Sequence, residues 1–256
     1  MQLVVLGSGT SVFHPQRAAA AFWLETDHGS LLLDCSADAP HRMAEEGLDW
    51  PGLDAIWISH LHLDHCGGLA PLLFGMKHAP QTQSRTKPLR IFGCAGARKL
   101  LDAIDHAHNY KLSSLPFPVE FTEISANSPS SFEPVKALTA TTQSTPHRRE
   151  SLALRVTNTH GTTIVYTSDT GFSEDVARFA GNADLFVLEC SFFRHKPIQT
   201  HLELADAMRM AALAEPRRVM LTHLYPEWDA IDLEAEARKL WPGETIGARD
   251  GLRIEI

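Results

Sequence analysis

Residues 59–68 read Ser-His-Leu-His-Leu-Asp-His-Cys-Gly-Gly, directly after the apolar run 55–58. Within this stretch, three histidines and one aspartate lie close together: His60, His62, Asp64 and His65. Imidazole mixed with carboxylate is typical of hydrolytic metal sites, whereas closed structural zinc sites are rich in thiolates. Leu61 and Leu63 indicate that the segment lies against a core, where four polar groups are costly to bury unless they bind something. A metal-ligand cluster at a strand end is therefore predicted, with a histidine-rich surface patch as the alternative.

The chain contains two successive sets of strand-like and helix-like segments. Short β-rich runs bounded by Gly, Pro and Asp recur in the first half, and helix-like stretches lie between them. The second half repeats this alternation of strand-like and helix-like segments, from a hairpin at 151–167 to a closing strand at 252–256. This order predicts an α/β fold, a four-layer αβ/βα sandwich of two packed mixed sheets with helices outside. Residues 1–256 are expected to form a single domain, and residues 125–134 a surface loop.

The spacing of the four cluster residues resembles the HxHxDH signature of the metallo-β-lactamase superfamily. The resemblance implies further ligands at later strand ends, and three residues follow in the matching order: His147, Asp169 and His223. It implies that one metal ion is held by His60, His62 and His147, and the other by Asp64, His65 and His223. Asp169 would bridge the two ions and leave an open position for a water or hydroxide. Asp64 is also expected to accept a hydrogen bond from this nucleophile.

The segment 184–223 narrows the resemblance to ribonuclease Z and its phosphodiesterase relatives. Similarity extends from the turn at residues 7–10 to residues 248–251, which is nearly the whole chain. Glu189 and His201 match a glutamate and a histidine that lie beside the metals in that group. The resemblance implies that His201 contacts the scissile phosphate and acts as general acid, while Glu189 orients it. The residues alone also allow a solvated helix-start histidine and a structural carboxylate hydrogen-bonded to backbone.

The chain departs from typical ribonuclease Z between His147 and Asp169. In that family a long arm rich in glycine and basic residues lies there and grips tRNA, whereas only 21 residues separate the two positions here. The resemblance therefore supports phosphodiester hydrolysis more strongly than it supports tRNA as the substrate. Three arginines are candidates for a small site that holds an anion, with a solvated charge cluster as the alternative: Arg148, Arg149 and Arg155.

Composition limits the partners of the protein. The formal net charge of -8 argues against an extensive nucleic-acid surface, while bound cations would still attract a small anionic substrate. No stretch approaches the ~18 apolar residues of a membrane span, and the first residues lack a basic signal region, so a cytoplasmic protein is expected. The four cysteines are widely spaced and are expected to be reduced, mostly buried thiols: Cys35, Cys66, Cys94 and Cys190.

The expected function is that of a binuclear metal-dependent phosphodiesterase acting on a small nucleotide-like or RNA-end phosphodiester. Two divalent ions are expected, with zinc as the default and manganese or iron as alternatives. The same ligands also suit hydrolysis of a lactone, thioester or β-lactam. A non-catalytic binding protein of the same fold is a third possibility, which the filled ligand positions disfavour. The run 72–76 leaves a homodimer open, because it suits either a dimer patch or a core helix.

Overall fold

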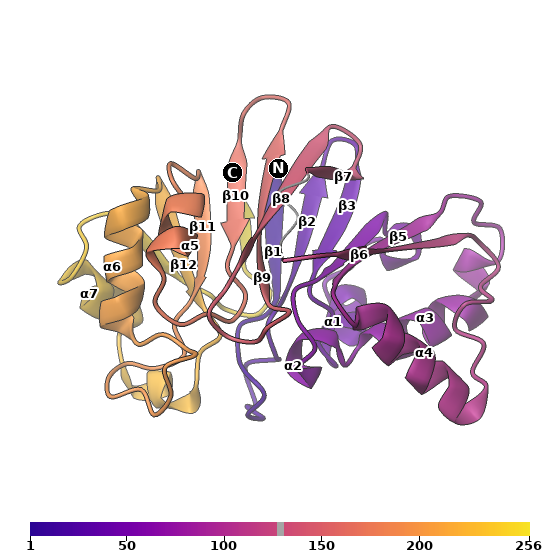
Figure 1. Ribbon diagram of the computed structural model, residues 1–256, viewed down its shortest axis with the longest axis horizontal. Coiled ribbons are helices and arrows are strands. Elements are labelled where there is room, and N and C mark those ends of the chain that lie inside the picture. The colour runs from indigo at the N-terminus through magenta and orange to yellow at the C-terminus, as the bar shows by residue number, and fades with distance from the viewer. Residues whose placement is uncertain (127–130) are drawn as a thin grey trace.

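The computed structural model describes residues 1–126 and 131–256. Two seven-stranded sheets pack together, with helices on their outer sides (Figure 1). The first sheet contains, in spatial order, β14 (Arg253–Glu255), β1 (Gln2–Gly7), β2 (Ala21–Thr26), β3 (Gly29–Leu33), β4 (Ala55–Ile58), β5 (Leu89–Cys94) and β6 (Val119–Ile124). The second contains β13 (Glu244–Gly247), β12 (Arg218–Thr222), β11 (Leu185–Glu189), β10 (Thr163–Tyr166), β9 (Leu152–Asn158), β8 (Leu138–Ser144) and β7 (Phe132–Val135).

Both sheets are mixed. In the first sheet β1 pairs antiparallel with β14 and β2, and β2 with β3, whereas β3 to β6 run parallel. In the second sheet β7 to β10 are antiparallel and β10 to β13 are parallel. The predicted sandwich of two packed mixed sheets is therefore confirmed.

Helices cover the outer faces of the two sheets on opposite sides of the molecule (Figure 1). The helices of the first half are α1 (Ala39–Glu45), α2 (Leu63–Cys66), α3 (Leu69–His78) and α4 (Ala97–His108). Those of the second half are α5 (Glu174–Phe179), α6 (Leu204–Ala214) and α7 (Leu233–Arg238). Short 3₁₀ turns occupy Trp50–Gly52, Pro80–Thr82 and Pro226–Ala230.

The alternation of side chains along each strand explains the layers. In β1, Leu3 and Val5 join the core between the sheets, whereas Val4 and Leu6 join the core under the helices. Successive side chains of a strand point to opposite faces, so a strand buried on both faces must be apolar at every position. β11 follows the same rule with the helices of the second half. The sheets are thus held by three apolar layers, one between them and one under each set of helices.

Several boundaries differ from the sequence-based expectation. The chain forms strands β6, β7, β8 and β13, which local patterns did not predict. The expectation of a loop at 125–134 is wrong in part, because β7 begins at Phe132. Residues 127–130 of this segment lie outside the described residues. Pro134 fits in β7 because this strand is the edge of its sheet, where a missing N–H is tolerated. Helix α6 begins at Leu204, so His201 lies before the helix.

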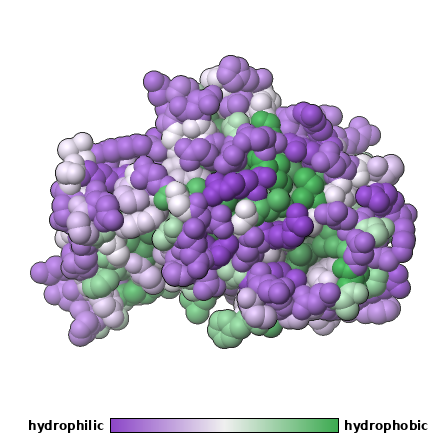
Figure 2. Space-filling model, turned by 180° about the vertical axis from the view of Figure 1, so that it is seen from behind, coloured by the Kyte–Doolittle hydropathy of each residue, from purple (hydrophilic) through white to green (hydrophobic). Residues whose placement is uncertain are grey.

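One face of the molecule is covered mainly by hydrophilic side chains, with several smaller apolar patches between them (Figure 2). No helix in the described part of the chain is long and apolar enough to cross a membrane. All four cysteines are buried and free, as predicted. In the run 72–76, Leu72, Leu73 and Met76 belong to the core of the first half, whereas Phe74 is 43% exposed.

Candidate metal centre

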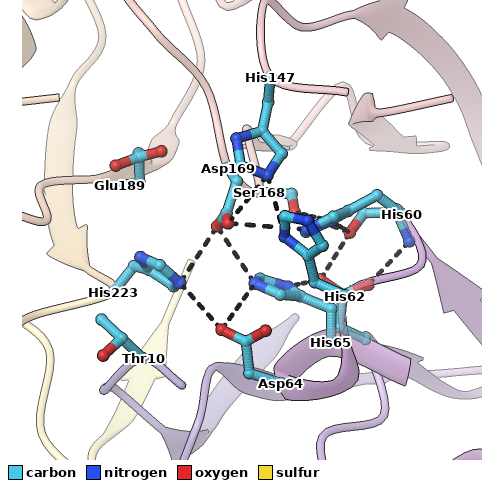
Figure 3. A network of polar contacts seen from close by, with 12 residues as sticks. Thr10, His60, His62, Asp64, His65, His147, Ser168, Asp169, Glu189 and His223 are labelled. Atoms are coloured by element: carbon cyan, nitrogen blue, oxygen red, sulfur yellow. Dashed lines mark hydrogen bonds and ion pairs between the residues drawn. The ribbon is translucent and has the colours of Figure 1, made fainter. Parts of the chain in front are cut away.

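The structure brings the seven predicted ligand residues together at one edge of the sandwich (Figure 3). His60 and His62 follow β4, and Asp64 and His65 lie in α2. The other three come from the second sheet, in loops after strands: His147 after β8, Asp169 after β10 and His223 after β12. Because parallel strands end at the same edge of a sheet, residues distant in sequence converge there.

Asp169 lies between two groups of ligands. Its Oδ2 is 3.6 Å from His60 Nε2 and 3.5 Å from His147 Nε2. Its Oδ1 is 3.1 Å from His65 Nε2 and 3.2 Å from His223 Nε2. One carboxylate oxygen therefore faces each group. Within each group the ligand atoms lie within 4.8 Å of one another; the groups are His60, His62, His147 with Asp169, and Asp64, His65 with His223.

Several atoms at the centre of this cluster are buried and make no hydrogen bond among the described residues. They are His60 Nε2, His65 Nε2, His223 Nε2 and Asp169 Oδ1. Leaving buried polar atoms without a hydrogen bond is costly, so such a concentration favours a bound ligand. Imidazole nitrogens and carboxylate oxygens pointing at a common centre suit a divalent cation.

The outer nitrogens of these histidines are held by surrounding groups, which turns each Nε2 inward. Asp34 Oδ2 lies 2.7 Å from His65 Nδ1, and it also accepts hydrogen bonds from Ser59 Oγ and the Tyr166 hydroxyl, both at 2.8 Å. Ser59 Oγ in turn lies 3.0 Å from His60 Nδ1. Such outer contacts fix the ring orientation of metal-binding histidines.

A similar arrangement holds the ligands from the second half. His147 Nδ1 lies 3.0 Å from the Thr200 carbonyl oxygen, and His223 Nδ1 lies 2.9 Å from Ser191 Oγ. Sequence reasoning missed Asp34 and Ser191. The available signal was weak: each is a small polar residue directly after or near a strand end, which usually indicates a turn.

Glu189 and His201 form a buried pair beside the cluster. Glu189 Oε1 lies 3.0 Å from His201 Nδ1, and His201 Nδ1 lies 3.9 Å from Asp169 Oδ2. Glu189 also accepts hydrogen bonds from the backbone N–H groups of Thr170 and Leu202. His201 is only 7% exposed. The solvated helix-start position considered for His201 is therefore wrong, whereas Glu189 combines the backbone role with contact to His201.

Four residues of the cluster have pKa values shifted in the direction that suits a cation, whereas the pKa of His65 is shifted the opposite way. Burial lowers the pKa of His60, His62 and His147, so their imidazoles are neutral and carry a lone pair. For Asp169, burial acts to raise the pKa, but the neighbouring His223 and His65 hold it well below the ordinary value. For His65, burial acts to lower the pKa, but Asp169 and Asp34 outweigh it, and the pKa is raised well above the ordinary value.

The backbone is unusual at this edge. Asp34, Ser168 and His223 have φ of 57°, 53° and 60°, in the left-handed region that non-glycine residues rarely adopt. Such conformations persist where the surrounding structure requires them, commonly at functional sites. Gly68, at the end of the signature, must be a glycine for a steric reason, because a Cβ there would lie 2.0 Å from the Ser36 carbonyl oxygen. The loop after β3 and the start of α3 therefore pack closely together, and Cys35 in this loop donates its backbone N–H to the His65 carbonyl oxygen.

The arginines proposed to hold an anion divide into two classes. Arg155 donates hydrogen bonds to the carbonyl oxygens of Phe179 and Gly181, so it supports the fold and the expectation for it is wrong. Arg148 is exposed, and its charge acts to lower the pKa of His62. Arg149 is also exposed. Of the three arginines, Arg148 is therefore the one with an electrostatic effect on a cluster residue.

Comparison with known proteins agrees with the fold and the site. The family described as Anti-Pycsar protein Apyc1 matches residues 1–241. The uncharacterized protein ML1173 of Mycobacterium leprae is 29% identical over 100% of this chain and 89% of its own length. The ribonuclease Z of Haloferax volcanii is 26% identical over 100% of this chain and 95% of its own length. The crystal structure of the metallo-β-lactamase fold protein YhfI from Bacillus subtilis has a TM-score of 0.81 at 25% identity and covers 99% of both chains.

These relatives confirm the predicted metallo-β-lactamase fold and the resemblance to the ribonuclease Z branch. Together with the cluster of histidines and aspartates, they support a metal-dependent hydrolase. Since the family match spans most of the sequence, the chain belongs to the family of Anti-Pycsar protein Apyc1.

Proposed function

We propose that this protein is a phosphodiesterase that acts on a small nucleotide-like substrate or an RNA end. The observation that carries the proposal is the placement of Asp169, whose two oxygens face separate ligand groups, with the Glu189–His201 pair alongside. The relationship to a ribonuclease Z supports the choice of a phosphodiester.

The buried atoms without hydrogen bonds fit two divalent ions, with zinc as our first choice and manganese or iron as alternatives. His60, His62 and His147 would hold one ion; Asp64, His65 and His223 the other; and Asp169 would contact both. When bound, such a pair lowers the pKa of water towards neutrality and stabilises charge on phosphoryl oxygens.

The chain's own side chains then position the substrate and move protons. Asp64 and His201 both line a cavity of about 390 Å³ above the cluster, together with Tyr225. Asp64 accepts a hydrogen bond from the nucleophile and so orients it. His201 Nδ1 is held by Glu189, which leaves Nε2 for the substrate. From this nitrogen His201 contacts the phosphate and donates a proton to the leaving oxygen.

The substrate is proposed to be small because the chain between His147 and Asp169 is short. The structure describes every residue of this segment, and they form the hairpin of β9 and β10 with its connections. The acidic net charge also disfavours long nucleic acids. Exposed Arg148 and Arg149 next to His147 are proposed to attract a small anion to the site.

The competing function is hydrolysis of a lactone or thioester, because the same ligands can polarise a carbonyl group. The pair of Glu189 and His201 favours the phosphodiester, since a leaving alkoxide benefits from a proton donor. A purely binding role is disfavoured by the complete set of ligands.

A substrate panel tests the proposal. The metal-loaded protein is assayed with bis(p-nitrophenyl) phosphate, cyclic nucleotides, lactones and thioesters, beside Asp64→Ala and the exposed control His160→Ala. We expect turnover of phosphodiesters, its loss in Asp64→Ala and its retention in the control. Turnover confined to lactones or thioesters would assign the competing function, and no turnover at all would favour a binding role.

A further inference from the structure

A groove next to the metal centre is larger than the cavity above the ligands. Its volume is about 760 Å³, and it lies between the loop that joins β1 to β2 and the segment around α1. Ser11, Leu63 and Asp64 line both the groove and the smaller cavity above the cluster. The two spaces are therefore adjacent, which places the groove within reach of a substrate held at the ligands.

The loop at residues 8–20 projects from the edge of the sandwich (the indigo loop between β1 and β2 in Figure 1), but its base is anchored. Asp250 accepts hydrogen bonds from the backbone N–H of Ser8 at 2.9 Å and of Ala18 at 2.7 Å. Asp229 pairs with His14 Nε2 at 2.9 Å and also with Arg17. The ends of the loop are thus fixed to the C-terminal part of the chain, which holds the tip in place over the groove.

The tip of this loop is apolar and unusually exposed. Phe13 is 101% exposed, Val12 is 40% exposed, and Leu63 across the entrance to the metal centre is 71% exposed. All three line the groove. Neighbouring exposed apolar side chains commonly mark a binding surface, because covering them removes apolar area from water.

Most of the other side chains that line the groove are polar, and some already have partners. Arg42 is paired with Glu45 and Glu46. Asp38 and His41 are exposed and line the same groove, and His41 Nε2 lies 3.0 Å from Glu45 Oε1, so its Nδ1 edge is the one offered to an occupant. An occupant with apolar faces and polar edges satisfies both kinds of wall, and this is the chemistry of a nucleobase.

We infer that this groove binds the nucleobase of the substrate, with Phe13 as a stacking surface, Leu63 as an apolar contact, and Asp38 and His41 facing the polar edge of the base. The inference rests on the proposed phosphodiesterase function for the identity of the occupant. It adds the residues that determine which phosphodiester binds, and it makes the loop at 8–20 a specificity element.

Binding of free nucleosides tests this inference without any bond cleavage. Saturation-transfer NMR with adenosine or uridine is recorded on the metal-loaded wild type, Phe13→Ala, Phe13→Tyr and the matched control Phe74→Ala, whose ring is exposed on α3. We expect transfer to base protons in the wild type, its loss in Phe13→Ala, and its retention in Phe13→Tyr and Phe74→Ala. Equal transfer in Phe13→Ala and the wild type would overturn the inference.

Kinetics separate this inference from the proposed function. Thymidine 5′-(p-nitrophenyl) phosphate and methyl p-nitrophenyl phosphate share a leaving group, but only the first carries a base. In Phe13→Ala the ratio of their kcat/KM values is expected to fall about tenfold, mainly through KM, as is typical for loss of one base-stacking contact. An unchanged ratio, with both diesters cleaved, would overturn the inference and leave the phosphodiesterase intact. If neither diester is cleaved while nucleosides still bind through Phe13, the phosphodiesterase fails and the base site stands.

Discussion

The metal cluster and the groove beside it are built in opposite ways. In the cluster, His60, His65 and Asp169 are almost completely buried, and surrounding hydrogen bonds fix the imidazole orientations. In the groove, Phe13 and Leu63 are largely exposed, although the loop that carries Phe13 is anchored at its base and through His14. From this difference we infer that the buried cluster determines the reaction and that the exposed groove selects the substrate. Substitutions in the two parts should therefore change different quantities.

The largest effect is expected at Asp169, the carboxylate shared by both ligand groups. Asp169→Asn keeps the shape of the side chain but removes its negative charge and one acceptor oxygen. We expect activity to fall below detection and the metal content, measured by inductively coupled plasma mass spectrometry, to drop. Asp27→Asn, at an exposed aspartate, serves as the control. Full metal content and activity in Asp169→Asn would remove this residue from the centre.

His201→Ala tests a group that lies beside the ligands. We expect kcat to fall by roughly 10² to 10⁴ for a substrate with an alkoxide leaving group, because the proton donor is lost. The loss should be smaller for a p-nitrophenolate leaving group, which departs without a proton. Steady-state rates with the two substrates, beside the control His160→Ala, measure this contrast. Equal losses with both leaving groups would argue for a role of His201 in phosphate contact alone.

A smaller effect is expected one contact further out, at Asp34. Asp34→Asn weakens the charged contact to His65 Nδ1 while retaining a polar side chain for Ser59 and Tyr166. Replacing such outer contacts typically lowers metal affinity by about 10- to 100-fold. Competition with a fluorescent chelator measures the affinity, again with Asp27→Asn as the control. An unchanged affinity would mean that the orientation of His65 does not depend on the charge of Asp34.

The same difference explains what the sequence predicts well. His60 to His65 are contiguous, and their residue types and spacing are visible without knowledge of the fold. His147, Asp169 and His223 are single residues after strands, and only the resemblance to a family selected them from similar turn residues. Asp34 could not be recognised, because its role depends on contacts with His65 and Tyr166, which both lie far from it in sequence.

The failure to predict β7 and β8 from the sequence has a related cause. β8 contains mostly small and polar residues, Leu138-Thr-Ala-Thr-Thr-Gln-Ser144, and is recognised as a strand only through its pairing with β7 and β9. β7 contains a proline that argues against a strand unless the edge position is known. The exposure of Phe13 is equally hidden, since an aromatic residue in a loop is usually expected to pack against something.

The smallest expected change is a shift of a pH profile, and it tests how Glu189 acts on His201. Burial acts to lower the pKa of His201, but the hydrogen bond and negative charge of Glu189 outweigh it, so the pKa is raised. A general acid must be protonated, so activity should decline as pH rises through this pKa. Glu189→Gln removes the charge, lowers the pKa of His201, and should move the alkaline limb of kcat to lower pH.

Profiles of kcat against pH, recorded with an alkoxide leaving group, measure this shift in Glu189→Gln and in the exposed control Glu120→Gln. The melting temperature is measured in parallel, because Glu189 also accepts hydrogen bonds from the backbone of Thr170 and Leu202. A loss of stability without a shift of the alkaline limb would reduce Glu189 to a structural carboxylate. A shift of the limb in a folded variant instead identifies Glu189 as the residue that keeps His201 protonated at the pH of catalysis, since a structural role would leave the titration unchanged.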